Sequence, residues 1–335
     1  MKHRFVTAFL LMCLIPSGIF TAPRKITIKL AASVPENTPW GAHLNKMAAE
    51  WRDASNGEVE LKIYWDGTQG GEAAVLRKLK SNAIQAAILS SFGLNEITPE
   101  VLTLSCPFLI RNDGELDAAL AAVKPELERK INSSKTFFML AWSKVGWVKF
   151  FSKAPVYVPN DLKRQRLGAN ESDAQLLDAF KAMGYTMVPV AQNQILVSLS
   201  GGQIDAVYLS PVMAGGTQAF GLAKRMASLN VAPFLGAIVV NQTTWKRIPE
   251  QYRDTLLRIA KRHEAELNGA VAQLEAEIIE TMQRHGLIIN EITPEQAQLW
   301  YNDVQQALPK LFGSTFDKPM YDRIEAIVNA YRKRN

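Results

Sequence analysis

The chain has 335 residues, of which 47% are hydrophobic and 21% are charged, and its formal net charge is +6. This length leaves room for two domains or one large one, and the composition is ordinary for a globular protein. The charge is mild for the length and argues against a dedicated nucleic-acid binder, which normally concentrates basic residues on one face.

The N-terminus, residues 1–22, has the order of a secretory signal peptide. A basic start at residues 2–4 precedes an apolar stretch at 5–15, and a proline and small residues follow. The apolar stretch is too short to span a bilayer comfortably. We therefore expect an exported, periplasmic protein. Cys13 raises the alternative of a lipid anchor, which the large side chain of Met12 disfavours.

Cys106 is the one cysteine that remains after removal of the signal. An exported chain with a single cysteine has no internal disulfide, so its core must hold it together. Cys106 lies in the apolar run LTLSCPFLI, which predicts a small buried hydrophobe and not a reactive thiol.

From residue 25 the chain alternates short strands with helices. Three strands are predicted from period-2 alternation or a short apolar run, at 26–30, 59–65 and 84–91. Two helices are predicted between them, from Asn37 or Thr38 to a stop at Asn56-Gly57, and at about 72–81. This β-α-β-α-β order implies a mostly parallel sheet with helices on both sides.

The pattern restarts after a predicted helix at about 113–132. Two strands are predicted on either side of Val145-Gly146, where we place the crossover between two lobes. The elements after it alternate again, with strands at 166–170, 186–191 and 204–210 and helices at about 172–183 and 194–202. Two similar α/β lobes follow from this order, although the sequence has no internal repeat.

The longest predicted helix covers residues 248–286. Apolar residues recur at steps of three and four from Tyr252 to Met282, which forms one continuous stripe. At 1.5 Å per residue the helix is about 55 Å long, more than one lobe needs. We expect it to run across both lobes and tie them together. His263 lies on the stripe, which predicts a packed core residue and not a ligand.

The chain contains no common catalytic signature: no G-x-G-x-x-G, no P-loop, no H-E-x-x-H and no G-x-S-x-G. None of its four histidines has another histidine, or Cys106, at metal-ligand spacing. Glu275, Glu277 and Glu280 cluster on the long helix but lie off its apolar stripe, which predicts a solvated face. We therefore predict a protein that is not an enzyme and that needs no metal or cofactor.

Tryptophans are the first candidates for a binding site. Trp65 closes a strand just before a loop, and Trp142 and Trp147 flank the predicted crossover. Ligands of α/β sheets bind at the carboxyl ends of strands and between lobes. A role in the core is an equal alternative for these side chains.

Five segments follow one another in a recognisable order. IYWDGTQGGE is similar to a strand-then-turn P-x-x-Q-L-G segment, and LSCPFLIRN to L-P-F-L-F. APVYVPNDLK is similar to K-P-I-x-x-P-E-D-L-K-G, and QNQILVSLSGGQIDAVYLSP to S-E-V-Y-T-A-L-Q-T-G-V-V-D-G-x-E-N-P. VVNQTTWKRIPEQYRDTLLRIA is similar to V-x-N-x-x-x-W-x-x-L-P-x-D-x-Q. Over nearly all of the mature chain, the sequence thus resembles the DctP-type solute-binding proteins of tripartite ATP-independent periplasmic (TRAP) transporters.

The resemblance implies an α/β fold of two lobes that close on a small-molecule ligand, with a long helix spanning both. It places lobe I at 23–145 with about 236–270, and lobe II at 146–235 with about 271–335. It implies delivery of the ligand to TRAP membrane permease subunits, and no enzyme activity. Some transporters of this family use an additional tetratricopeptide-repeat partner, so a further protein contact is an open alternative.

The resemblance also shows where this chain departs from the family. There, an arginine on the strand after D-L-K-G forms a two-pronged salt bridge with the ligand's carboxylate, because its planar guanidinium matches that geometry. Aligning DLKRQRLGAN from Asp161 places Gly168 at the arginine position. Arg166 is an alternative clamp if the register slips by two, because residues two apart share one face of a strand.

The other positions that the resemblance assigns to the pocket also lack charge. A basic residue of some members falls at Val148, an acid at Ser90, and an aromatic residue at Gln192. The glutamate and asparagine of E-N-P fall at Tyr208 and Leu209. The predicted ligand-binding residues are Trp65, Ser90, Trp147, Val148, Gly168, Gln192, Tyr208, Leu209 and Phe234, with Arg166 as the alternative clamp.

These substitutions predict a neutral, largely apolar or amphipathic ligand. Burying a ligand carboxylate without a paired charge costs several kcal/mol, whereas apolar ligand surface gains roughly 25 cal/mol for each Å² buried. Glycine at 168 also leaves volume, so the pocket is expected to be enlarged. Two alternatives stay open: an organic-acid receptor clamped by Arg166, and a sensor or interaction protein without a transport role.

Overall fold

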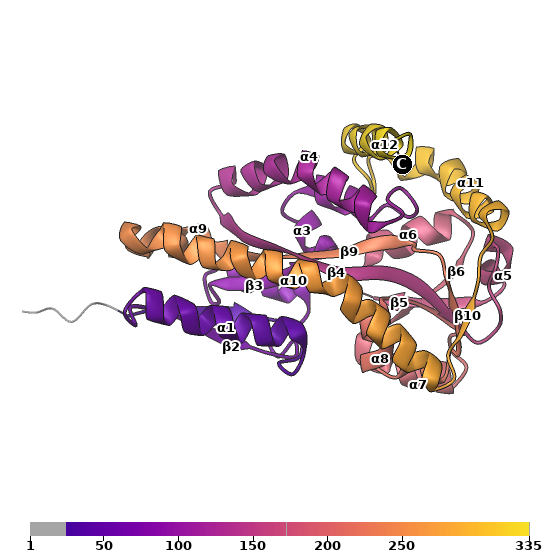
Figure 1. Ribbon diagram of the computed structural model, residues 1–335, viewed down its shortest axis with the longest axis horizontal. Helices are drawn as coiled ribbons and strands as arrows, with labels where there is room; N and C mark the ends of the chain where they lie inside the picture. Colours follow the sequence, from indigo (N-terminus) through magenta and orange to yellow (C-terminus); the bar gives the residue numbers. More distant parts are fainter. Residues whose placement is uncertain (1–24, 172, 335) are drawn as a thin grey trace, which may run out of the picture.

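The computed structural model describes residues 25–171 and 173–334, and only the backbone of Gln192. The signal peptide predicted for residues 1–22, with Cys13, lies outside the described residues. Within them the chain forms a ten-stranded sheet with helices packed around it (Figure 1). Along the sheet the strands run in the order β2-β1-β3-β9-β4-β7-β5-β6, while β8 pairs with β4 and β10 with β8. The predicted α/β class is confirmed.

The first half of the sheet is parallel, as predicted. Its strands are β1 (Ile26–Ala31), β2 (Val59–Tyr64) and β3 (Ala86–Ser90), connected by α1 (Pro39–Ala54) and α2 (Glu72–Lys80). Thr38 caps α1 by accepting a hydrogen bond from the backbone of Gly41, which confirms the predicted helix start. Asn56 and Gly57 take left-handed backbone angles after the helix, so the predicted stop is confirmed.

The second half repeats this arrangement. Its parallel strands are β5 (Arg166–Asn170), β6 (Thr186–Val190) and β7 (Ala206–Leu209). Its helices are α5 (Pro159–Lys163), α6 (Ala174–Ala182), the 3-10 turns η2 (Gln192–Gln194) and η3 (Ala219–Gly221), α7 (Ile195–Ser200) and α8 (Pro211–Gly216). The predicted alternation of strands and helices in this half is confirmed.

Two long antiparallel strands join the halves: β4 (Phe137–Ser152) and β9 (Ala232–Asn241). The prediction of two strands around Val145-Gly146 is wrong, because β4 runs through this point without a break. The register between β4 and β9 shifts at Lys144/Gly146, where Gly146 has φ 109°. A bulge with a glycine absorbs the extra residue and lets one strand serve both halves.

The remaining helices cover the sheet. They are α3 (Ser91–Asn95), η1 (Pro99–Ser105), α4 (Asp113–Ser133), α9 (Gln242–Arg247), α10 (Glu250–Arg284), α11 (Pro294–Leu311) and α12 (Lys318–Arg332), with β8 (Arg225–Ala227) and β10 (Ile288–Asn290) between them. α10 has 35 residues and packs against α1, β4 and α8 in turn (Figure 1). At about 52 Å it spans both halves, as predicted.

The last helix returns to the first half. Arg332 on α12 pairs with Glu115 on α4, with Nη2 and Oε2 2.8 Å apart, and the backbone N–H of Asp317 donates to Thr103. The grouping of residues 271–335 with the second half therefore does not describe α12.

Aromatic and aliphatic side chains fill the interior on both sides of the sheet, with Trp51, Phe150 and Trp300 among the largest that are fully buried. Cys106 has no exposed surface, which confirms its predicted burial. Among the described helices, none has both the length and the hydropathy that crossing a membrane requires.

Candidate functional site

Strand directions place the ends of the two parallel groups opposite each other. β3 is antiparallel to β9, β9 is antiparallel to β4, and β7 is antiparallel to β4. β3 therefore points toward the second half, and β7 points toward the first. Ser90 ends β3 and Leu209 ends β7. We call the region between these two residues the strand-end junction, and α/β proteins bind ligands at such carboxyl ends.

Several predicted site residues meet along this junction. Val148 pairs with Ala232 across β4 and β9, and Phe234 pairs with Gly146. Val148 is buried, whereas Phe234, Tyr208 and Leu209 each keep part of their surface exposed. The ring of Tyr208 packs against two buried phenylalanines, with its centroid 5.8 Å from that of Phe150 and 5.5 Å from that of Phe180. The junction is thus largely apolar and aromatic on the side of the second half.

On the first half, Ser90 is held by an acid that the sequence did not single out. Glu72 starts α2, and its carboxylate accepts hydrogen bonds from the backbone N–H of Ser90 at 2.6 Å and from its hydroxyl at 2.8 Å. The Ser90 hydroxyl in turn accepts from the N–H of Phe92. Burial raises the pKa of Glu72, and these hydrogen bonds lower it in part. Ser90 therefore orders the turn into α3, and Glu72 is the ionisable group at this end of the junction.

Trp65 follows β2 and is half-buried against the apolar side chains between α1 and the sheet. Gln192 starts the 3-10 turn after β6, which is the carboxyl end of that strand. The backbone thus puts both residues at the carboxyl ends of strands.

Gly168 does not open extra volume. A Cβ built on this residue lies 2.7 Å from Cδ1 of Ile204, which is fully buried. Ile204 therefore fills the space in front of the glycine, and it belongs to an apolar cluster with Val207 and Leu199. The expectation of an enlarged pocket at this position is wrong, because a neighbouring core side chain occupies the space.

Arg166 is already paired. It stands at the start of β5, at the end of the strand away from the junction, and its guanidinium makes two hydrogen bonds to Asp205, at 2.7 and 2.8 Å. This pairing raises the pKa of Arg166 and lowers that of Asp205. The alternative that Arg166 clamps a ligand carboxylate therefore conflicts with both its position and its partner.

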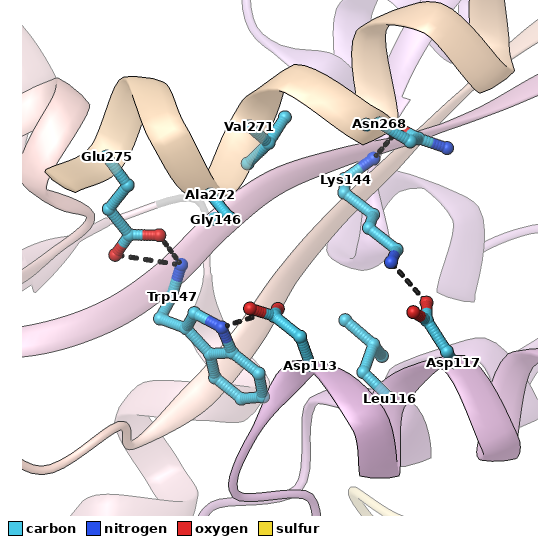
Figure 2. Close-up of a pocket in the computed structure, with 11 residues that line it drawn as sticks. Asp113, Leu116, Asp117, Lys144, Gly146, Trp147, Asn268, Val271, Ala272 and Glu275 are labelled. Atoms are coloured by element: carbon cyan, nitrogen blue, oxygen red, sulfur yellow. Dashed lines mark hydrogen bonds and ion pairs between the residues drawn. The ribbon is translucent and has the colours of Figure 1, made fainter. Parts of the chain in front are cut away.

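Trp147 faces a different region from the one predicted. Its indole Nε1 donates to Asp113 on α4 at 3.0 Å, and its backbone N–H lies 3.1 Å from Oε2 of Glu275 on α10 (Figure 2). These contacts border a cavity of about 300 Å³ between α4, β4 and α10. Lys144 crosses the cavity wall, since its backbone donates to Asn268 and its ammonium pairs with Asp117 (Figure 2).

A second cavity of about 290 Å³ lies beside the first and shares Asp117, Lys144 and Asn268 with it. Both are lined by charged and amide side chains that bond to one another, and also by apolar side chains such as Leu116, Leu120 and Leu235. We call the two cavities together the seam between α4 and α10. The sequence carried little signal for this seam, because its residues come from three elements that are far apart along the chain.

Glu275 is buried, with 6% of its surface exposed, so the prediction of a solvated position is wrong for this residue. Gly146 leaves the space that the carboxylate needs, because a Cβ there is 2.7 Å from Oε2 of Glu275. Burial raises the pKa of Glu275 to about 7, although nearby Lys149 lowers it in part. Burial also lowers the pKa of Lys149 to about 8, and its ammonium donates to Ser228 and Asn230.

One hydrogen bond joins helices of the two halves beside the junction. The side-chain nitrogen of Asn95 on α3 donates to Oε1 of Gln175 on α6 at 2.8 Å. Asn95 is buried, and its side-chain oxygen makes no hydrogen bond with the described residues. The pair therefore depends on how the two halves sit against each other.

Comparison with known families identifies the chain. The profile of the bacterial extracellular solute-binding protein family 7, DctP, matches residues 30–315. The chain belongs to this family. Two curated proteins align with most of the length of this chain. The 2,3-diketo-L-gulonate-binding periplasmic protein YiaO of Escherichia coli is 24% identical over 70% of this chain and 72% of its own. The C4-dicarboxylate-binding protein DctB of Bacillus subtilis is 23% identical over 82% of this chain and 79% of its own.

Solved structures share the fold of the family 7 protein. A TRAP periplasmic solute-binding protein of Pseudomonas putida F1 with bound D-glucuronate has a TM-score of 0.80 at 22% identity, over 90% of this chain and 97% of its own. A second, of Sulfurospirillum deleyianum with bound succinate, has a TM-score of 0.81 at 21% identity, over 91% and 99%. The predicted two-lobed fold is thereby confirmed, as is the resemblance to TRAP solute-binding proteins. Such proteins are transport receptors and not enzymes.

Proposed function

We propose that this family 7 protein is exported by residues 1–22 and binds a neutral, apolar or amphipathic ligand at the strand-end junction. The receptor then delivers the ligand to TRAP membrane permease subunits. Lobe I comprises residues 23–145 and about 236–270, together with α12, and lobe II comprises 146–235 and about 271–311. The long strands β4 and β9 and helix α10 connect the two lobes.

The observation that carries the choice of ligand is the absence of an available cation at the positions that match the family's clamp. Gly168 faces Ile204, Arg166 is paired with Asp205, and Val148 is apolar and buried. Glu72 adds an acid at the opposite end of the junction. A ligand carboxylate placed here gains no paired charge, and its burial then costs several kcal/mol.

An organic acid is the second candidate. The names of the relatives support it, since one binds 2,3-diketo-L-gulonate and another C4-dicarboxylates, and two structural neighbours hold D-glucuronate and succinate. This candidate requires a clamp other than Arg166, because Asp205 occupies that guanidinium.

Native mass spectrometry of the protein, purified after export and without denaturation, tests the first candidate. We expect a co-purified neutral or lipid-like mass. Calorimetric titrations with succinate and D-glucuronate are the matched assays for the second candidate, and the first predicts no heat of binding beyond dilution. Tight binding of either acid, with no neutral molecule co-purified, would refute the neutral-ligand proposal and favour the acid.

A further inference from the structure

Two histidines from distant parts of the chain meet between α1 and α10. Nδ1 of His43 lies 3.2 Å from Nδ1 of His263, and the rings are perpendicular, with centroids 5.5 Å apart. Glu266, one turn after His263 on α10, places Oε2 3.9 Å from the first nitrogen and 3.7 Å from the second. The predicted burial of His263 is confirmed, at 5% exposed.

We propose that His43, His263 and Glu266 bind a divalent transition-metal ion of the Zn²⁺ type. Imidazole nitrogens bind zinc at about 2.0–2.1 Å in tetrahedral geometry, which puts two such nitrogens about 3.3 Å apart. The observed 3.2 Å between the Nδ1 atoms already matches this separation. The Glu266 oxygen needs a shift of only a few tenths of an ångström, and its side chain is 49% exposed, which leaves room for that shift.

A carboxylate lies near the second ring nitrogen of His263, as is common for histidines that bind a metal. Metal-bound histidines commonly donate their second ring N–H to a carboxylate, which fixes the ring. Oε1 of Glu50, on α1, lies 3.4 Å from Nε2 of His263. In the described part of the chain this buried nitrogen makes no hydrogen bond, so the contact is near but not yet aligned. A metal at Nδ1 leaves Nε2 as the donor and gives Glu50 a role as its acceptor.

Both basic and acidic side chains surround the proposed metal site. Arg262 pairs with Glu50 and places Nε 3.4 Å from Oε1 of Glu266, and Lys46 follows His43 by three residues on α1. The cations weaken the attraction for a divalent ion, and the two carboxylates offset them. Histidine and carboxylate ligands select Zn²⁺ and its neighbours over Mg²⁺, which prefers an all-oxygen octahedron.

The three proposed ligands lie on α1 and on the part of α10 that belongs to the first lobe. These two helices pack against each other at that point. Three protein ligands leave a fourth position for water, so the ion is exchangeable. Its effect is to fasten α1 to α10, and this is separate from ligand binding at the strand-end junction. The competing interpretation is a hydrogen bond between the two rings, with one nitrogen as donor and the other as acceptor.

Calorimetry with Zn²⁺, on protein purified after export, without a histidine tag and treated with chelator, tests the proposal. We expect one ion per chain, no comparable binding of Mg²⁺, and a rise in Tm of about 4 °C at a hundredfold excess over Kd. His43→Ala and Glu266→Gln each weaken binding by about tenfold or more. His285→Ala is the matched control, because His285 is exposed at the end of α10 and its ring Nδ1 lies 2.8 Å from the backbone oxygen of Thr281.

The absence of stoichiometric Zn²⁺ binding overturns the proposal and leaves a hydrogen-bonded histidine pair. Wild-type affinity in both His43→Ala and Glu266→Gln also overturns it, because the ion then binds elsewhere. Glu266→Gln changes an exposed side chain without altering its size, so this arm stays decisive if His43→Ala fails to fold.

Discussion

Arg166 and Asp205 form a two-pronged ion pair at the start of β5, with Nε 2.7 Å from Oδ2 and Nη2 2.8 Å from Oδ1. The backbone N–H of Arg166 donates to the same carboxylate at 3.1 Å. Both of these guanidinium donors therefore bind a carboxylate of the same lobe. Because of this pairing, Arg166 is not available to bind a ligand carboxylate.

Arg166→Ala is expected to leave ligand affinity unchanged, because the side chain is exposed and points to Asp205 rather than to the junction. The stability loss is expected to be small and to shrink further at high salt, as for other exposed ion pairs. Titration of the co-purified ligand into both proteins measures the first effect, and urea unfolding at two salt concentrations the second. Asp205→Asn is the matched control, and loss of binding only in Arg166→Ala would restore the clamp hypothesis.

Gly168→Ala is expected to destabilise the protein by about 1–3 kcal/mol through overpacking. The new Cβ meets Cδ1 of Ile204 at 2.7 Å inside a buried cluster. Ile204→Val removes that methyl group. The double variant is therefore expected to lose less stability than the sum of the losses of the two single variants. Urea unfolding of the four proteins measures the coupling, and strictly additive effects would show that residue 168 does not face Ile204.

Glu275 is expected to make stability depend on pH. Its pKa rises from 4.5 to about 7 on folding, so the folded state holds this proton more tightly than the unfolded state. Stability from this group therefore falls as pH rises from 4.5 to 7. Lys149 has the opposite dependence, because its pKa falls from 10.5 to about 8, and stability then rises with pH between 8 and 10.5.

Thermal unfolding of Glu275→Gln between pH 5 and 7.5 measures the first effect. The variant is expected to show a flatter decline of Tm with pH than the wild type, because the amide does not titrate. Glu280→Gln is the control, since Glu280 lies exposed on the same helix. Identical pH profiles for wild type and Glu275→Gln would contradict a raised pKa at this position.

Gln175→Ala is expected to cost about 1–3 kcal/mol, because it leaves the buried amide of Asn95 without its hydrogen-bond partner. Asn95→Ala in the same background is expected to add less than it does alone, since the pair is already broken. Urea unfolding measures both. Gln298→Ala removes an exposed amide pair with Asn302 and is the control. Equal losses of unfolding free energy for Gln298→Ala and Gln175→Ala would show that the contact with Asn95 stabilises the protein no more than an exposed amide pair does.

Most secondary structure of this chain is predictable from local patterns. The period-2 strand at 26–30, the cap at Thr38, and the apolar stripe of α10 each come from residues close together in sequence. Element type depends on such local spacing, and so the two α/β halves and the long helix follow from it. Five family-like segments in order were enough to indicate the receptor class.

The site is much less predictable, because its contacts join residues that are far apart along the chain. From the sequence alone we expected Gly168 to stand where the family resemblance places an arginine. Only the tertiary structure decided that Ile204 fills the space beside it, and that Arg166 turns to Asp205. The burial of Glu275 is decided the same way, since it depends on Gly146 of another element. Periodicity states which side of its own helix a residue faces, but packing across elements decides whether that side meets water.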